Sequence, residues 1–399
     1  MWRSAIAAVV LPLLSTFSYE AWKLSAHFLY QTGKADPSST MRAISYATHG
    51  GPEVLQVGDV PKPGSIGRGL VLVRIAAASL NPVDFKMRRN PQPDAVLPKP
   101  KIPGCDVSGV VVEVGEGTPF QPGDRVFGML PIVGQPWGGL AEYTVADHRV
   151  LALAPRSIPL VAAAALPLVG LTTLQTLDPA IEALPRDATK RALVQAAAGG
   201  VGSFAVQWLR HVHGFDEVIA TASPRHHELV SALGATAAID YTSAEGASHL
   251  SSVKGMDVVL DPVAWKYMEH TLDPSSGILR PGGWYCHILS TDWKSNAEES
   301  SPTLPLFGPF RKWATRFQSV FDRSTRRVYS SAVVPDAEGL ARIARHVDEG
   351  KLRPSIAQTV VGLDLERVRE AFAVLEEGRS GGKILVRPTA EDWWEESGK

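Results

Sequence analysis

The chain has 399 residues, of which 45% are hydrophobic and 20% charged, as is usual for a globular protein of two or three domains. Forty Lys and Arg residues balance 41 Asp and Glu residues, and this near-neutral charge argues against a general nucleic-acid binder. The two cysteines, Cys105 and Cys286, are too few for a four-cysteine zinc site or a disulfide scaffold.

The first forty residues predict an extension ahead of the folded body. The apolar run 5–14 is too short to cross a membrane, which takes about 20 apolar residues. A single acid, Glu20, among serines and basic residues favours a mitochondrial leader. Secretion or membrane association, and a peripheral apolar terminus in a cytoplasmic protein, are the alternatives. Residues 36–39 predict a linker, and the body is expected from Met41.

The first part of the body predicts an irregular β-rich domain. Glycine and proline are dense from residue 50 to 139, and strands are expected at 71–75 and 107–114. Residues 160–177 are rich in Ala and Leu and predict a buried helix.

From Arg191 onward, apolar strands alternate with helices, which implies a parallel sheet covered on both faces. The expected strands are 192–194, 218–220, 237–239, 257–260 and 284–289, and the expected helices are 202–208 and 227–233. Two amphipathic helices follow near 340–347 and 368–375, before a last strand at 383–386. The tail with Trp393 and Trp394 is expected to be exposed.

The strongest motif is the glycine turn at residues 198–202, which follows a strand and opens a helix. Such a turn lets backbone N–H groups approach a diphosphate, and the helix N-terminus adds positive potential. The flanking strand and helix give the glycines the context of a dinucleotide site.

The second strand of this unit favours NADPH over NADH. An NAD site usually has an acid at the end of that strand, but here Asp216 and Glu217 lie at its start. Ser223 and Arg225 follow its end and suit a 2′-phosphate. For Arg225 the alternative is a solvated surface charge. Tyr241 either lines the adenosine or is an ordinary edge residue.

Several further motifs follow one another along the chain. They are Asn81-Pro82-Val83-Asp84, Gly104-Cys105-Asp106 with the strand after it, Gly123–Val126, Gly138–Tyr143, Ala165–Thr173 and Gly382-Lys383-Ile384. With these motifs, residues 41–388 resemble the zinc-free, quinone-oxidoreductase-like branch of the medium-chain dehydrogenase/reductases. Residues 350–354 and the leader-like N-terminus most resemble the mitochondrial reticulon-4-interacting protein 1 group.

The resemblance implies an α/β fold in two domains. Residues 41–165 and 334–388 would form a GroES-like β-barrel catalytic domain. Residues 166–333 would form a Rossmann domain with a doubly wound parallel sheet that binds NADPH. Residues 1–40 would then be the leader or extension with its linker, and 389–399 a tail. Relatives are often dimers, so a homodimer is compatible with the resemblance.

The resemblance also implies site residues. Together with Gly202 and Arg225 from the motifs, the expected NADPH contacts are Ala198, Gly200, Val201, Ser223, Tyr241 and Ile288. Asn81, Thr172 and Lys383 would border the nicotinamide.

A catalytic zinc ion is not expected, because Cys105 and an acid stand where zinc-dependent relatives carry several ligands. Hydride transfer then needs alignment and a donor to the acceptor oxygen, for which Asn81 is the candidate. Asp84 and Lys86 either assist it or form a structural ion pair. Enoyl-thioester reductases of the superfamily carry a tyrosine proton donor shortly after the Asn81 motif. Residues 85–100 contain no tyrosine, so the proton donor stays unassigned.

Two functions stay open. One is an NADPH-dependent reductase acting on a small quinone or enone, with no nucleic-acid partner. The other is an NADPH-binding mitochondrial assembly or interaction factor without catalysis. The aromatic and basic segment 307–327 predicts either a lid or lipid-facing surface, or an amphipathic helix packed on the body.

Overall fold

The computed structural model describes residues 35–64, 66–91, 99–132, 134–185, 189–263, 268–288, 327–331 and 333–394. The leader-like segment up to residue 34 and the aromatic and basic segment up to residue 326 lie outside these residues. Within the described ranges, no helix has the length and apolar character needed to cross a membrane.

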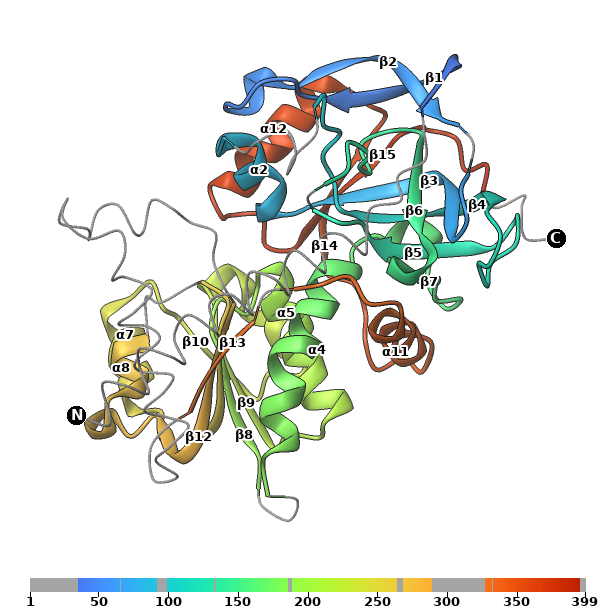
Figure 1. The fold of residues 1–399 in the computed structure, drawn as a ribbon. Coiled ribbons are helices and arrows are strands. Elements are labelled where there is room, and N and C mark those ends of the chain that lie inside the picture. The colour runs from blue at the N-terminus through green and yellow to red at the C-terminus, as the bar shows by residue number, and fades with distance from the viewer. Residues whose placement is uncertain are drawn as a thin grey trace, which may run out of the picture.

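A seven-stranded sheet lies in the upper half of Figure 1. Its order is β14-β15-β3-β4-β5-β7, with β6 paired to β3. The strands are β3 (Leu70–Leu80), β4 (Asp106–Val114), β5 (Arg125–Met129), β6 (Tyr143–Asp147), β7 (Leu151–Leu153), β14 (Ile356–Val361) and β15 (Lys383–Arg387). β1 (Ala35–Ser45) and β2 (Gln56–Pro63) form a separate antiparallel ribbon. The last strands of the chain therefore return to the sheet formed by the first ones.

A six-stranded parallel sheet fills the lower half of Figure 1. Its strands are β8 (Arg191–Val194), β9 (Glu217–Thr221), β10 (Ala237–Ile239), β11 (Met256–Asp261), β12 (Leu279–Ile288) and β13 (Arg327–Ser331). The spatial order β10-β9-β8-β11-β12-β13 is the 3-2-1-4-5-6 order of a doubly wound dinucleotide-binding sheet. The predicted parallel sheet is confirmed.

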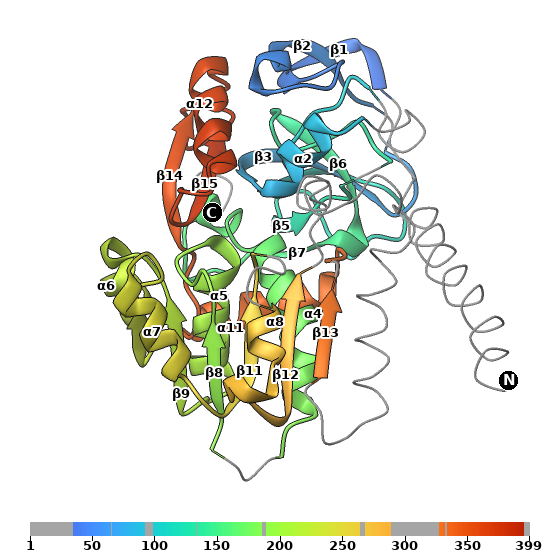
Figure 2. The same ribbon diagram turned by 90° about the vertical axis from the view of Figure 1, so that its left-hand side faces the viewer.

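Both faces of this sheet are covered, as Figure 2 shows from the side of α7 (Ala244–Ser252) and α8 (Met268–Leu272). Val258 and Leu260 of β11 pack into the cluster formed with α4 (Pro167–Glu182) and α5 (Gly200–Gln207). Val259, between them, points into the cluster on the α7 and α8 face. This alternation explains why residues 258–260 in the middle of the strand are all apolar.

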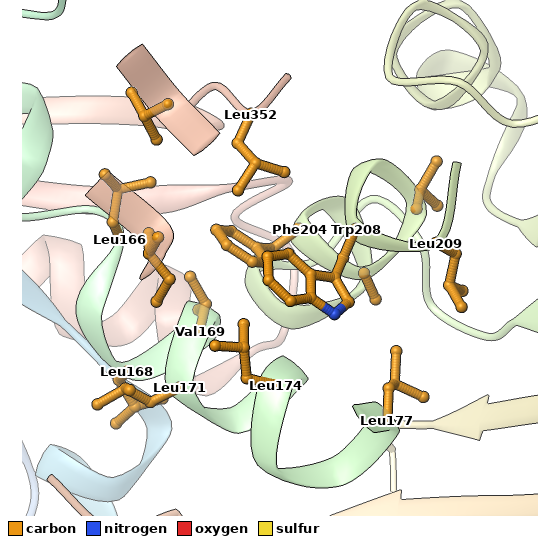
Figure 3. Packing of buried hydrophobic residues seen from close by; sticks show 14 of the residues in the cluster. Leu166, Leu168, Val169, Leu171, Leu174, Leu177, Phe204, Trp208, Leu209 and Leu352 are labelled. Atoms are coloured by element: carbon orange, nitrogen blue, oxygen red, sulfur yellow. The ribbon is translucent and has the colours of Figure 1, made fainter. Parts of the chain in front are cut away.

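The apolar run at 160–177 forms two helices rather than one, α3 (Leu160–Ala163) and α4. Pro167 starts α4, where its missing N–H costs no helical hydrogen bond. Figure 3 shows Trp208 packed between α4 and the chain at Leu352. The indole N–H donates to Asp178 Oδ1 at 2.8 Å, so this large and fully buried side chain has a polar partner.

The remaining helices are short or C-terminal. They are α2 (Pro82–Arg89), α6 (His227–Ala232), α11 (Ala337–Asp348) and α12 (Leu365–Glu376). The two predicted C-terminal helices are confirmed. Asp336 caps α11 by accepting the N–H of Glu338 at 3.0 Å.

Both ends of the body differ from the sequence prediction. Residues 36–39, predicted as a linker, belong to β1, where Asp36 lies opposite Lys62. The tail is not exposed at Trp394, whose side chain is 3% exposed in the main hydrophobic cluster. Arg387 lies over the Trp394 ring at 4.9 Å, and Arg74 lies over Trp393 at 4.0 Å. Burial of the Trp394 indole, and the contact of both indoles with cationic side chains, outweigh the polar character of the neighbouring residues.

Candidate active site

The glycine turn lies at the end of β8, between β9 and β11 in the parallel sheet. Ala196, just before it, has a φ of 47°, in the left-handed region that non-glycine residues rarely adopt. Its N–H donates to Thr221 Oγ1 at 3.1 Å, and the N–H of Ala197 donates to Thr221 O at 2.9 Å. The end of β9 therefore holds the turn in this conformation.

Close packing requires one glycine of the turn, Gly202, and leaves little room for a side chain at another, Gly200. A Cβ atom on Gly202 would lie 2.4 Å from Ala196 O, and one on Gly200 would lie 3.0 Å from Val169 and 3.2 Å from Lys383. α5 begins at Gly200, so the N–H groups of its first turn have no partner within the helix. These N–H groups and the helix dipole suit a diphosphate group.

Three polar residues gather at the end of β9. The Ser223 hydroxyl lies 3.3 Å from His226 Nδ1, and Arg225 between them is exposed. His226 Nε2 faces Gly381, where a Cβ atom would lie only 2.6 Å away. Burial, with Arg225 nearby, lowers the pKa of His226. Sequence reasoning did not select His226, because only the fold brings it beneath Gly381.

The other predicted cofactor contacts occupy neighbouring elements. Tyr241 follows β10 and is 47% exposed, and Ile288 ends β12. Thr172 lies in α4 with only 1% exposure, and its hydroxyl has no hydrogen-bond partner in the described part of the chain. A buried hydroxyl without a partner is unfavourable, so Thr172 would be stabilised by a ligand group that reached its hydroxyl.

One buried carboxylate, that of Asp106 in β4, connects four segments of the chain. Its Oδ2 accepts hydrogen bonds from Ser79 Oγ at 3.0 Å, Asn81 Nδ2 at 2.8 Å and Lys383 Nζ at 3.1 Å. Its Oδ1 accepts the N–H of Leu168, in the first turn of α4, at 2.8 Å. β3, β15 and α4 are therefore all joined to β4 through this one side chain.

Lys383 is 4% exposed and orients Asn81. Its ammonium group also donates to Leu80 O at 3.2 Å and to Asn81 Oδ1, so each of its three protons has an acceptor. Asn81 is 1% exposed, and its amide is held at both ends, by Lys383 and by Asp106. The structure thus brings together Asn81, Lys383 and Gly200, which the sequence predicted to border one ligand.

Asp84 ties two motif loops to each other. Its carboxylate accepts the N–H of Asn81 at 2.8 Å and the N–H of Gly104 at 2.9 Å. Burial raises the pKa of Asp84 to about 6. Asp84 was expected either to assist Asn81 in the reaction or to have a structural role. These contacts favour the structural role, which Asp84 performs by accepting backbone N–H groups.

A cavity of about 10 Å³, the size needed for one water molecule, lies beside Asp84 and is also lined by Tyr46, Lys101, Cys105 and Trp137. The Lys101 ammonium donates to Gln135 O at 2.7 Å and to Trp137 O at 3.3 Å. Burial lowers the pKa of Lys101 to about 8, and burial beside Asp84 and Asp106 raises the pKa of the Cys105 thiol well above its ordinary value.

Comparison with known proteins agrees with this geometry. Residues 67–156 match the family profile of the alcohol dehydrogenase GroES-like domain, and residues 233–386 match that of the zinc-binding dehydrogenases. An Arabidopsis thaliana protein named NADPH-dependent alkenal/one oxidoreductase, chloroplastic, is 32% identical over 90% of this chain and 82% of its own length. Mitochondrial reticulon-4-interacting protein 1 of Caenorhabditis elegans is 30% identical over 88% and 96%.

The fold is shared as well. The structure of the quinone oxidoreductase from Coxiella burnetii superposes with a TM-score of 0.68 and 30% identity, covering 88% of this chain and 99% of that one. The chain therefore belongs to the medium-chain dehydrogenase/reductases, in their quinone-oxidoreductase-like branch. The GroES-like and Rossmann folds inferred from the resemblance are confirmed.

The residues present do not fit the zinc ion that one family name implies. In the described ranges, no group of three or more His, Cys, Asp or Glu side chains could hold a metal ion. The Cys105 sulfur faces Asn81 Nδ2 at 3.5 Å in a setting that disfavours the thiolate. Asp106, beside it, already has four donors.

The Asp106 cluster predicts a strong energetic coupling. Asp106→Asn leaves the Lys383 ammonium buried without its counter-charge, so we expect a loss of about 3–5 kcal/mol in the free energy of unfolding. The double variant Asp106→Asn with Lys383→Met should also be destabilised. Its loss in free energy of unfolding should be smaller, by at least about 1 kcal/mol, than the sum of the losses of the two single variants. Urea denaturation measures all three, with Asp392→Asn as the exposed control. Strict additivity would contradict the coupling.

Lys101 predicts a pH dependence of stability. Its pKa is about 8 in the folded chain against an ordinary value of 10.5, so the unfolded chain binds more protons between these pH values. Stability contributed by this group therefore rises as pH increases from 8 to 10.5, by about 3 kcal/mol at most.

The test compares the parent with Lys101→Met by urea denaturation at pH 7.5 and pH 10. The parent should gain stability relative to Lys101→Met at the higher pH, and Lys351→Met is the exposed control. Unfolding free energies that stay parallel across this range would show that the ammonium is not held as described.

Proposed function

We propose that this protein is an NADPH-dependent oxidoreductase that transfers a hydride to a quinone or a conjugated carbonyl compound without a metal ion. The observation that carries the proposal is the contact between the glycine turn and the buried cluster, where Gly200 packs on the Lys383 side chain that holds Asn81. A dinucleotide on the turn would have its reactive end beside a fixed amide.

The residues present fit NADPH. The N–H groups of Gly200, Val201 and Gly202 would bind the diphosphate, and the unpartnered Thr172 hydroxyl would gain a partner at the nicotinamide end. Ser223 and Arg225 would bind the 2′-phosphate. Bound NADPH supplies the hydride, while Ala198, Tyr241 and Ile288 complete the proposed contacts.

Asn81 is the proposed donor to the acceptor oxygen, which gains negative charge as the hydride arrives. Lys383 bonded to Asn81 Oδ1 polarises the amide and strengthens its N–H groups as donors. Asp106 offsets the charge of Lys383 and fixes the orientation of both side chains. One Asn81 N–H is taken by Asp106, so the acceptor oxygen would take the other, which faces only distant acceptors, Ser79 O at 3.4 Å and Cys105 Sγ at 3.5 Å.

The relatives support the reaction class and the compartment. The Arabidopsis protein is named for an NADPH-dependent reaction on alkenals and enones, and the Coxiella protein for quinone reduction. Both plant and nematode relatives are named as organellar, one chloroplastic and one mitochondrial. We propose a mitochondrial location and a small quinone or enone as the substrate. Homodimer formation stays a prediction.

The test is NADPH oxidation by the purified protein with a panel of simple quinones and enones. We expect turnover with NADPH and weaker binding of NADH. Arg225→Ala should weaken NADPH binding about tenfold and leave NADH binding unchanged, because only NADPH carries the phosphate that Arg225 would pair with. Cofactor fluorescence titration measures both affinities, and Arg367→Ala is a control on α12.

Two results would overturn parts of this proposal. Equal affinities for NADPH and NADH in the parent would contradict the 2′-phosphate assignment. Tight NADPH binding without turnover on any acceptor of the panel would favour the alternative, an NADPH-binding factor that acts through other proteins.

A further inference from the structure

A second cavity, of about 240 Å³, lies in the catalytic half and shares no lining residue with the candidate active site. β1, the end of β2, β3, the start of β6 and the C-terminal tail contribute to its wall. Lys62, Thr389 and Trp393 in this wall fall outside the segments 67–156 and 233–386 that match the family profiles. The cavity is therefore built partly from residues outside the two segments that the family profiles match.

Two cations face this cavity from aromatic supports. The Arg74 guanidinium lies over the Trp393 ring at 4.0 Å, and Lys62 Nζ lies over the Tyr143 ring at 3.8 Å. Both side chains are half-buried, and within the described residues neither forms an ion pair or a side-chain hydrogen bond. A guanidinium stacked on a ring keeps its N–H groups at the edge, where they can bind an oxyanion in a bidentate manner.

Hydroxyl groups supply further donors. Thr389 lines the cavity, and its Oγ1, which is shielded from solvent, has no hydrogen-bond partner in the described structure. Ser39 and Thr40 of β1 lie in the same wall. A shielded hydroxyl without a partner is unfavourable unless a ligand engages it.

One acidic side chain opposes the two cations. Glu142 lines the cavity, and its Oε2 accepts the N–H of Arg42 at 2.9 Å. The three charged side chains leave a net charge of one positive unit. An anion would be held by Arg74 and Lys62, with its affinity reduced by Glu142.

We propose that this cavity binds a phosphate group, either free phosphate or the phosphate of a small monoester. A phosphate monoester has three terminal oxygens and free phosphate has four, enough acceptors for the Arg74 fork, the Lys62 ammonium and a wall hydroxyl at once, whereas a carboxylate has only two oxygens. This inference is independent of the proposed reaction, because none of these residues belongs to the nucleotide turn or the Asp106 cluster.

The experiment is calorimetric titration of the full chain with inorganic phosphate and with glycerol phosphate, in phosphate-free buffer with NADPH in excess. NADPH keeps the nucleotide turn occupied, and repeating the titration without it shows whether that turn contributes. We expect one phosphate group per chain in the presence of NADPH. Tighter binding of glycerol phosphate would identify a monoester as the natural ligand, and tighter binding of inorganic phosphate would identify the free ion.

Three variants test the charges. Arg74→Gln and Lys62→Gln should each weaken phosphate binding about tenfold, whereas Glu142→Gln should tighten it several-fold and can still accept the Arg42 N–H. Arg367→Gln is the exposed control and should leave affinity unchanged. Arg74→Gln removes the contact with the Trp393 ring, so weaker phosphate binding in this variant could reflect a disturbed cavity. Tighter binding in Glu142→Gln has no such explanation, because a general loss of structure cannot raise the affinity.

The proposal is overturned if phosphate does not bind, if acetate binds and phosphate does not, or if the affinity is the same in the parent, Arg74→Gln and Glu142→Gln.

Discussion

The buried carboxylate of Asp106 is the constraint on which the site depends. It accepts four hydrogen bonds. The donors are Ser79 and Asn81 at the end of β3, the first turn of α4, and Lys383 in the last strand. A buried ion pair is stabilising only when its remaining donors and acceptors are satisfied. The hydrogen bonds of Asp106 and Lys383 offset the cost of burying this ion pair. The same bonds fix the positions of β15 and α4 relative to β4.

The same contact positions the chemistry. Lys383 reaches from Asp106 to Asn81 on one side and packs under Gly200 on the other. The nucleotide turn and the proposed acceptor site are therefore built on one rigid polar unit. Orientation and a fixed electrostatic environment are what a protein contributes when a cofactor carries the redox chemistry.

The features that sequence predicted well are local. Short sequence patterns predicted the alternation of apolar strands and helices after Arg191 and the glycine turn at 198–202. The structure contains both features. The break before Pro167 is also local, and the proline signal for it was present in the sequence. The domain boundaries and the individual cofactor contacts stay predictions.

What sequence could not supply is the set of pairings between distant residues. Asp106 and Lys383 stood in separate motifs, and nothing in either motif predicts that the two would share a hydrogen bond. Trp394 sits among acidic residues, so its burial depends on the surface that it meets in three dimensions. Likewise, the shared cavity of Arg74 and Thr389 forms only once the C-terminal tail has folded back onto β3.

The most direct measurement for the central claim is a crystal structure of the full chain with NADPH bound. The account predicts the diphosphate on the N–H groups of Gly200, Val201 and Gly202, the nicotinamide end within hydrogen-bond distance of the Thr172 hydroxyl, and an unchanged contact between Lys383 and Asp106. A turn that stays vacant while NADPH binds elsewhere, or a nicotinamide remote from Asn81, would contradict it.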